Sequence, residues 1–581
     1  MKQTIEINES IFEFEYEEEA RIAFSKKSEE NGIAVYHVCF DWGELTSPKP
    51  ITLSYEIPAT DLYYMWDAIH PQRNLSFSYR ATESRLPWGM PLKSLVSRNG
   101  NNAYLVALSD VKTPLSIRMR CNNERPTVTV SIDFFTMLCG PFSHYETELR
   151  IDCRKIAFDE AIYGARKWFD ALGYQNGYVP DAALRPMYST WYSYTKSIDT
   201  ESILAECREA VRYGMDTVIV DDGWQTGRYD SMYGNCGDWN PAPEKFPDMK
   251  AFTDAIHALG MKAMLWYATP FMGEFAQKYE EFQAMCLEYS SKMSTYFLDP
   301  RYREVRSFLI ETFSHAVRDW GFDGLKLDFI DRFKTNGEYN EIMDTVSVED
   351  ATERLLSEVS DALKAINPNV LIEFRQPYFG PVVSTYGNMM RVWDCPLDGA
   401  RNRVQSLNLR LVCGGCAVHS DMIVWNAADT PENVAQQLFG TMFSVPQISV
   451  RMEQVTDLHS KVLRNYLQFW NAHRDTLMRE KVRMTLCENG YGTAWVENER
   501  EKIVQLADCS VPEFDGRAAV IYAVNLTGGE NLIVKNTAGV PIRMNIYDCM
   551  GECIAKDVVL TARLNEVLAP QGALLVLKRG M

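Results

Sequence analysis

The sequence contains no apolar run that approaches the roughly 20 residues needed to cross a bilayer. Its first residues also lack the continuous apolar core of a signal peptide. Positive charge is not in excess, because the formal net charge is −19, which repels phosphate backbones and anionic lipid headgroups. We therefore expect a cytoplasmic protein that binds neither nucleic acid nor a membrane surface.

Cysteine pairs at zinc-finger spacing are also missing. The 14 cysteines are scattered, mostly through apolar segments, where a reduced thiol acts as a small hydrophobic side chain. One motif, Cys413-Gly-Gly-Cys416 with His419 just beyond it, lacks both a second cysteine pair and a thioredoxin-like context. No glycine-rich phosphate-binding loop occurs either. We expect no metal and no cofactor, and the role of the Cys413 and Cys416 pair stays open.

The two ends of the chain are rich in short β-type runs. A chain of 581 residues is too long for one core and indicates several domains. Alternating apolar and polar residues predict an antiparallel β-sandwich over residues 1–180 and a second one over residues 476–581. The predicted strands of the first sandwich include residues 32–40, 51–57, 75–81, 101–110, 115–121 and 127–135.

The central part of the chain, residues 181–475, alternates short apolar strands with amphipathic helices. Eight such repeats are what a (β/α)₈ barrel requires, so we predict this fold. The predicted strands are residues 186–194, 216–224, 262–270, 323–329, 370–377, 388–394, 416–422 and 447–452. The clearest helices are residues 200–214, 250–260, 303–321 and 351–367.

Polar and aromatic residues cluster at the carboxyl ends of these strands, which is where a barrel of this type forms its active site. Lys326 and Asp328 lie two residues apart on one strand and therefore point the same way, although charged side chains are rarely buried unless paired or functional. Aromatic rings with carboxylates and cations suit a neutral sugar. The strand ends carry Trp191, Tyr192, Asp221, Asp222, Trp224, Trp266, Tyr267, Lys326, Asp328, Glu373, Arg375, Gln376, Arg391, Asp394, His419 and Asp421.

Each of these residues taken alone has a plainer interpretation. An aspartate at a strand end is commonly the N-cap of the following helix, and tryptophans on strands are usually part of the core. The joint pattern favours a site, because six consecutive strands would each need a separate reason for a polar end.

Four segments resemble the barrel of glycoside hydrolase clan D, and most of all the family 36 α-galactosidases. They are "VIVDDGWQ", "CGDWNPAPEKFPDMKAFTDAIHALGMKAMLWYATP", "YFLDPRYREVR" and "WGFDGLKLDFID", in the order and spacing of that family. The resemblance covers about half the chain. It implies an α-galactosidase with β-domains on both sides of the barrel, often assembled as a homo-oligomer.

The resemblance also implies roles for individual residues. Asp328 corresponds to the nucleophile, and Lys326 to a residue that contacts sugar hydroxyls and helps to keep Asp328 ionised. Asp221 and Asp222 are implied to hold the hydroxyls at carbons four and six, and Trp224 to form a wall of that subsite.

The acid/base of the family follows strand six, after an arginine that touches the sugar. Arg391 is followed here by Asp394, with Asp398 as the second candidate, and we favour Asp394 because it is nearer the strand end. The two carboxyl groups would work by a retaining double displacement. For this role we expect burial and a negative partner about 5 Å away to raise the pKa of Asp394.

The segment after strand five departs from the family. Relatives carry a Cys/Ser-Gly-Gly-Gly element near carbon two of the sugar, whereas this chain has Glu373, Arg375 and Gln376. We favour a retaining α-galactosidase. The alternatives are an enzyme for another α-hexoside such as an α-N-acetylgalactosaminide, a transglycosylase, or a non-catalytic carbohydrate-binding protein. The presence of both candidate carboxylates disfavours the last of these. His419 is either a substrate contact or a core histidine.

Overall fold

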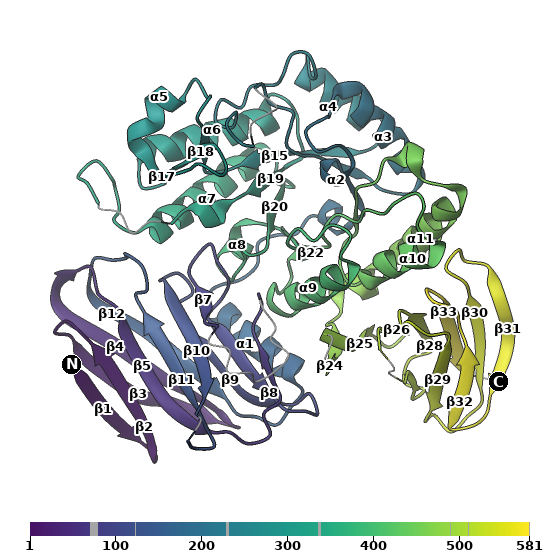
Figure 1. Cartoon of the computed structure of the whole chain (residues 1–581), viewed down its shortest axis with the longest axis horizontal. Helices are drawn as coiled ribbons and strands as arrows, with labels where there is room; N and C mark the ends of the chain where they lie inside the picture. Colours follow the sequence, from purple (N-terminus) through teal and green to yellow (C-terminus); the bar gives the residue numbers. More distant parts are fainter. Residues whose placement is uncertain are drawn as a thin grey trace.

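The structure confirms the predicted architecture of a central parallel barrel between two sets of β-sheets. Figure 1 shows the barrel at the top, with the N-terminal sheets below it on the left and the C-terminal sheets on the right. The positions of the domain boundaries near residues 180 and 475 stay a prediction. The computed structural model describes residues 1–69, 80–122, 124–227, 232–334, 339–487, 490–508 and 511–579.

The N-terminal region is a sandwich of two six-stranded sheets, with strand orders β1-β2-β5-β11-β10-β7 and β3-β4-β12-β9-β8-β6. Inward residues of β11 alternate with more exposed ones, as a half-buried strand requires. The predicted strand at 75–81 falls largely outside the described residues. The strands are β1 (Lys2–Ile7), β2 (Ser10–Tyr16), β3 (Arg21–Glu30), β4 (Ile33–Thr46), β5 (Ile51–Pro58), β6 (Tyr64–Trp66), β7 (Thr82–Ser84), β8 (Leu92–Val96), β9 (Asn102–Leu108), β10 (Leu115–Cys121), β11 (Thr127–Phe134) and β12 (Phe142–Asp152).

All eight predicted barrel strands are present and pair in parallel in the order β22-β21-β20-β19-β15-β14-β13-β23. Two isolated parallel bridges, His419 to Val445 and Ile423 to Ile448, bring the last two strands together and nearly close the ring. The strands are β13 (Met187–Ser189), β14 (Thr217–Val220), β15 (Lys262–Ala268), β19 (Gly324–Asp328), β20 (Leu371–Arg375), β21 (Met389–Arg391), β22 (Ala417–His419) and β23 (Gln447–Ile448).

Helices surround this sheet, and several begin where the sequence supplies a capping side chain. Asp199 forms a capping box with Ser202, and the Ser347 side chain accepts from the Asp350 amide. The four predicted helices are all found. The principal helices are α1 (Phe158–Ala171), which precedes the barrel, α2 (Trp191–Tyr194), α3 (Thr200–Arg212), α4 (Met249–Ala258), α5 (Tyr279–Phe282), α6 (Arg303–Arg318), α7 (Val348–Ile366), α8 (Val383–Tyr386), α9 (Gly399–Val412), α10 (Pro431–Gly440) and α11 (Asp457–Arg479).

The remaining strands form a small sheet that follows β15 and the sheets of the C-terminal region. The small sheet has the order β16-β18-β17, and the C-terminal sheets have the orders β24-β25-β26-β28-β33-β30-β31 and β27-β29-β32. Their bounds are β16 (Phe271–Gly273), β17 (Cys286–Ser290), β18 (Thr295–Leu298), β24 (Arg483–Cys487), β25 (Gly490–Glu497), β26 (Glu501–Leu506), β27 (Glu513–Phe514), β28 (Val520–Asn525), β29 (Asn531–Asn536), β30 (Ile542–Tyr547), β31 (Cys553–Leu560), β32 (Leu564–Leu568) and β33 (Leu574–Arg579).

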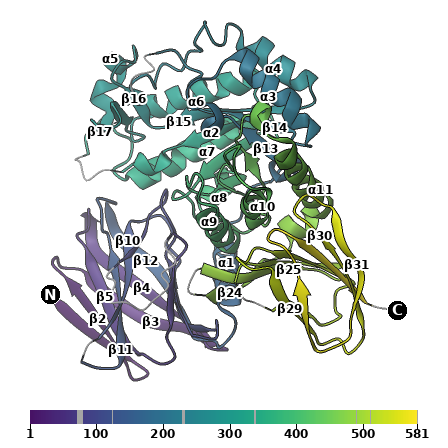
Figure 2. The same ribbon diagram turned by 45° about the vertical axis from the view of Figure 1, so that its right-hand side comes forward.

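The three regions meet at a buried tyrosine. The indole N–H of Trp66 donates to the Tyr491 hydroxyl at 2.9 Å, and that hydroxyl donates to the side chain of Asn408 on α9. Arg403, also on α9, donates to the Tyr491 carbonyl at 2.7 Å. Figure 2 shows α9 and α1 between the two β regions, so the N- and C-terminal sheets support one side of the barrel.

Candidate active site

Charged side chains at the carboxyl ends of the strands form one connected network in the structure. Asp328, Arg375 and Arg391 are the last residues of β19, β20 and β21, and Asp221 follows β14 directly. All four are less than a tenth exposed. Burial of this many charges is stable only if they pair with one another, and they do.

Asp328 lies at the centre of the network. Its Oδ2 accepts the indole N–H of Trp266 at 3.1 Å. Its Oδ1 accepts from Nε of Arg375 at 2.8 Å, from the backbone amide of Phe329 at 2.8 Å, and from the Tyr378 hydroxyl in a short hydrogen bond. Both carboxylate oxygens are therefore fixed in place by donors from three elements of the barrel.

The charges around Asp328 favour its ionised form. Burial alone would raise the pKa of Asp328, but Arg375 and Lys326 overcome this and hold the pKa below its ordinary value. The adjacent Phe329 has a left-handed backbone (φ 66°), which is uncommon outside glycine and concentrates at functional sites. Asp328 is thus a buried, oriented and negatively charged group, which are the properties of a carboxylate nucleophile.

The predicted pair Asp221 and Asp222 lies beside Lys326. Nζ of Lys326 donates to Oδ2 of Asp221 at 2.6 Å, which explains how a strand can bury a lysine. Asp222 accepts from Gln225 at 2.7 Å, and its second oxygen lies 3.4 Å from Nζ of Lys196. Burial raises the pKa of Asp222. These residues offer carboxylate and ammonium groups that match the hydroxyls of a sugar.

The predicted tryptophans take different positions. Trp266 is nearly buried and contacts Asp328 directly. Trp224 is completely buried, and its N–H donates to the Trp266 carbonyl at 3.0 Å, so it supports the site from behind and does not wall it. The ring of Tyr233 stacks on that of Trp266 at 6.3 Å. Trp191 is half-buried at the start of α2.

Arg391 connects three carboxylates at the other side of the network. Its Nη2 donates to Oδ1 of Asp394 at 2.9 Å, its Nη1 donates to Asp421, and its Nε lies 3.6 Å from Oε1 of Glu373. The hydroxyl of Tyr192 donates to Asp421 at 2.9 Å. Arg391 is almost fully buried, whereas the Asp394 side chain is 39% exposed. Asp394 is therefore the member of this group that a ligand can reach.

The expected rise in the pKa of Asp394 is not found. Burial would raise the pKa of Asp394, but Arg391, Arg375 and Lys326 reverse the effect and lower it below its ordinary value. The sequence argument counted burial and the negative partner but not these cations. In the structure, Asp394 favours its ionised form at neutral pH.

Asp398, the second acid/base candidate, has a structural role. Its side chain accepts the backbone N–H of Arg401 at 2.9 Å and caps the start of α9. The residue is exposed, and no described charged group of the network contacts its side chain. The plain interpretation of an aspartate before a helix is correct here.

The residues that replace the family's glycine-rich element also differ from expectation. Glu373 is fully buried and accepts from Gln447 at 2.6 Å, so it belongs to the barrel interior. Gln376 donates to Gln405 at 3.0 Å. Of these three residues only Arg375 contacts Asp328, while Glu373 meets the network through Arg391. Where the family has its glycine-rich element, this segment therefore places one cation, and not three polar side chains, against Asp328.

His419 is a core histidine. Its Nε2 lies 2.8 Å from the carbonyl of Ala183, and its Nδ1 lies 3.2 Å from the amide nitrogen of Gln447. Complete burial lowers the pKa of His419 to about 3, so the ring is neutral, donates to Ala183 and accepts from Gln447. The possible substrate contact at His419 is therefore not supported by its geometry.

The sequence reasoning did not select Tyr378 or Lys196. Tyr378 follows the last residue of β20 by three positions, and Lys196 lies beyond α2, so neither position is marked by strand periodicity. The segment "EFRQPY" did draw attention as a departure from the family, and Tyr378 is its last residue. Only the path of the backbone after the strand brings these side chains to the carboxylates.

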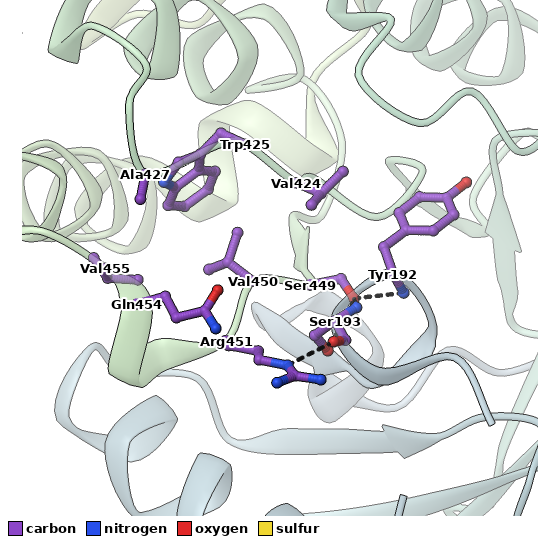
Figure 3. Close-up of a pocket in the computed structure, with 10 residues that line it drawn as sticks. All are labelled: Tyr192, Ser193, Val424, Trp425, Ala427, Ser449, Val450, Arg451, Gln454 and Val455. Atoms are coloured by element: carbon purple, nitrogen blue, oxygen red, sulfur yellow. Dashed lines mark hydrogen bonds between the residues drawn. The ribbon is translucent and has the colours of Figure 1, made fainter. Parts of the chain in front are cut away.

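A small cavity of about 110 Å³ lies next to the network, behind Tyr192. Figure 3 shows Trp425, Val450, Gln454 and Arg451 around it, with the Tyr192 hydroxyl pointing away from them. That hydroxyl donates to Asp421. The cavity therefore lies on the opposite side of Tyr192 from the charged network.

Neither a cluster able to hold a metal ion nor a helix able to cross a membrane is found among the described residues. No group of three or more His, Cys, Asp or Glu side chains among them is arranged to hold a metal ion. No helix in the same part of the chain is both long and apolar enough to cross a membrane.

Comparison with known proteins identifies relatives of the barrel. The melibiase family model matches residues 181–377. A segment of 216 residues is 30% identical to an A type blood α-D-galactosamine galactosaminidase of Flavonifractor plautii, covering 33% of this chain and 19% of that protein. A segment of 192 residues is 22% identical to the α-galactosidase AgaA of Geobacillus stearothermophilus, covering 32% of this chain and 26% of that protein. The matched segments thus span about a fifth to a quarter of these relatives.

Solved structures of other proteins match the fold of this chain over nearly its whole length. An α-galactosidase of Lactobacillus brevis superimposes with a TM-score of 0.65 at 12% identity, covering 100% of this chain and 83% of its own. A family 36 α-galactosidase of Geobacillus stearothermophilus, solved in complex with raffinose, gives 0.65 at 15% identity, covering 98% of this chain and 82% of its own. At these identities the likeness establishes the fold.

Proposed function

Because the melibiase family model matches residues 181–377, which hold five of the eight barrel strands, we propose that this chain is a retaining α-glycoside hydrolase that releases terminal α-linked galactose. The observation that carries the proposal is the buried, ionised Asp328, oriented by Trp266, Arg375 and Tyr378 beside the pair Lys326 and Asp221. The Lys-x-Asp segment that the sequence singled out thus contacts four residues outside its own strand, Trp266, Arg375, Tyr378 and Asp221.

The proposed reaction has two steps. In the first, the Asp328 carboxylate attacks the anomeric carbon from the face opposite the leaving group, while Asp394 gives its proton to the glycosidic oxygen as the bond breaks. In the second, the Asp394 carboxylate takes a proton from water, which attacks the same carbon and releases Asp328. Two inversions return the original configuration.

The contacts of Asp394 with Arg391 suit the second step better than the first. Since Arg391, Arg375 and Lys326 stabilise the ionised form of Asp394, it is a ready base for water. As an acid it must be protonated, and that form is the minor one at neutral pH. The first step is therefore the one that limits the rate at high pH.

The proposed sugar contacts follow from the same network. Lys326, Asp221 and Asp222 present charged groups that bind hydroxyls, and Trp266 presents an aromatic ring. Arg391 would orient Asp394.

A second substrate is favoured by one observation. The relative from Flavonifractor plautii is named as acting on α-D-galactosamine, and it is 30% identical over its matched segment. An α-linked amino or N-acetylamino galactoside is accordingly the alternative substrate. Hydrolysis of either substrate would use the same two carboxylates, Asp328 and Asp394.

We propose in addition that the protein works in a reducing compartment, the cytoplasm. Twelve of the 14 cysteines are free thiols in the described part of the chain, and eight of these are buried. The homo-oligomer implied by the sequence resemblance stays part of this proposal.

A panel of nitrophenyl glycosides tests the substrate. We expect turnover of the α-galactoside, with the α-galactosaminide, the α-N-acetylgalactosaminide and the α-glucoside slower by at least about tenfold in kcat/KM, since a site built for particular hydroxyls discriminates strongly. Product configuration is followed by NMR during the first turnovers. If the amino or N-acetylamino galactoside is turned over faster, it takes the place of the α-galactoside as the proposed substrate. A first product with inverted anomeric configuration would contradict the retaining mechanism.

The pH profile tests the state of Asp394. We expect kcat/KM on an unactivated galactosyl disaccharide to fall as pH rises from the acidic side, because the protonated fraction of Asp394 is lost above a lowered pKa. A galactoside with an acidic phenol as leaving group needs no proton and should not show this decline. A disaccharide profile that declines only in the alkaline range would contradict the lowered pKa.

A further inference from the structure

A pocket of about 440 Å³ opens between the N-terminal sandwich and the loops above the barrel strands. Its size lies within the roughly 300 to 1,000 Å³ that is usual for ligand sites. Trp88 lines it from the segment after β7, and Trp393 lines it from the segment after β21. The pocket therefore uses a part of the chain outside the barrel, for which the reaction proposed above has no role.

Three lining residues of the pocket are hydrogen-bonded to the proposed catalytic carboxylates or adjacent to them in the chain. Phe329, which lines it, follows Asp328, and Trp393 precedes Asp394. Arg375, a third lining residue, donates to Asp328. A leaving group that extends from a bond held between Asp328 and Asp394 would therefore point toward this space.

Cations dominate the lining. Since Arg375 is paired with Asp328, three cations, Arg85, Arg332 and Lys334, remain against the two carboxylates Glu83 and Asp331. This sign is opposite to that of the whole chain, whose formal net charge is −19. A local excess of positive charge in a hollow on an acidic protein concentrates anions there.

Arg85 has only part of its charge compensated. It donates to the backbone carbonyls of Phe333 at 2.9 Å and Asp331 at 2.6 Å, which are neutral acceptors. Glu349 lies 3.7 Å away, and burial raises the pKa of Glu349 to about 7, so this carboxyl is only partly ionised at neutral pH. Arg85 thus also fixes the loop that carries Arg332 and Lys334.

Arg332 and Lys334 are the cations available to a ligand. Nε of Arg332 is buried with no hydrogen-bond partner among the described residues, and the closest approach to Asp331 is 3.7 Å. Lys334 is exposed, and no ion pair within the described part of the chain involves it. The Arg332 side chain as a whole is 34% exposed, so an oxyanion in the pocket can accept charge-assisted hydrogen bonds from the exposed part of its guanidinium.

We propose that this pocket binds the leaving group of the substrate and that it selects a sugar bearing an oxyanion, a carboxylate or a sulfate, next to the scissile α-linkage. The anion contacts Arg332 and Lys334, while Trp88 and Trp393 cover apolar faces of the same sugar. This inference rests on the proposed hydrolase activity and specifies which galactosides the enzyme prefers.

The test compares three α-galactosyl disaccharides whose leaving sugars are glucose, glucuronate and glucose 6-sulfate. We expect kcat/KM for at least one anionic substrate to exceed that for the neutral one by about tenfold, as a charged hydrogen bond contributes. The double variant Arg332→Gln/Lys334→Gln should reduce this ratio by a similar factor, and added salt should reduce it in the parent. Arg212→Gln, on the exposed face of α3, is the matched control and should leave the ratio unchanged.

The two anionic substrates separate carboxylate from sulfate recognition. Equal or better turnover of the neutral disaccharide, or a ratio that the double variant does not change, overturns the proposal. If no α-galactoside is cleaved at all, the hydrolase proposal fails. The pocket is then judged by calorimetric titration of glucuronate and glucose 6-sulfate into the parent and the double variant. Binding that the double variant loses supports the anion site, and no binding to the parent overturns it.

Discussion

Asp328→Ala is expected to lower kcat for an α-galactoside by at least about 10³-fold, because removal of a nucleophile leaves only binding and electrostatic contributions. Activity with azide present should recover in part. The azide occupies the space of the lost carboxylate and attacks from the same face, so the recovered product should be the β-galactosyl azide. Product configuration by NMR is the decisive measurement.

The matched control is Asp361→Ala, which removes an exposed aspartate from α7, outside the network. It should retain the parent activity. Circular dichroism of both variants checks that the fold is kept, because Asp328 also accepts from Trp266, Arg375 and Tyr378. An active Asp328→Ala protein, or a recovered α-azide, would show that another group is the nucleophile.

Asp394→Ala is expected to affect substrates according to their leaving groups. Turnover of a disaccharide should fall by about 10² to 10⁴-fold, the usual contribution of general acid catalysis. A galactoside with an acidic phenol should still form the covalent intermediate, which then accumulates because no base activates water. Azide should accelerate its release and give the α-galactosyl azide, in contrast to the product from Asp328→Ala.

Asp398→Ala is the control that separates the two acid/base candidates. Loss of the cap on α9 should cost about 0.5 to 2 kcal/mol of stability and lower the apparent Tm, with kcat retained. If Asp398→Ala shows the leaving-group dependence and Asp394→Ala does not, the assignment is reversed. Thermal unfolding and kcat on the disaccharide, measured for both variants, decide between them.

The position of the site was predictable from the sequence because parallel strands bring their carboxyl ends to one face. Lys326 and Asp328 are two residues apart on β19, so their shared direction is set by strand geometry alone. The same argument placed Asp221 and Arg391 nearby, and the structure connects Asp221 to Lys326 and Arg391 to Asp394.

The function of single residues was less predictable, because it depends on which neighbour a side chain meets. Asp398 and Asp394 are four positions apart, yet one caps a helix and the other contacts Arg391. Glu373 and Arg375 share a face of β20, but Glu373 turns to Gln447 in the interior while Arg375 reaches Asp328. A polar residue at a strand end can either serve the local structure or contact the site. Its spacing in the sequence does not show which of the two it does.

The alternation of strands and helices, the barrel and the strand that carries Asp328 could be predicted from the sequence alone, because they follow from local periodicity and from the connection rules of parallel sheets. The charge state of Asp394 and the composition of the pocket at Arg85 and Arg332 depend instead on the three-dimensional fold. Both depend on distances between residues remote in the chain, and Coulomb interactions change with distance and not with sequence separation. Arg85, for example, donates to the carbonyl of Asp331, 246 residues further along.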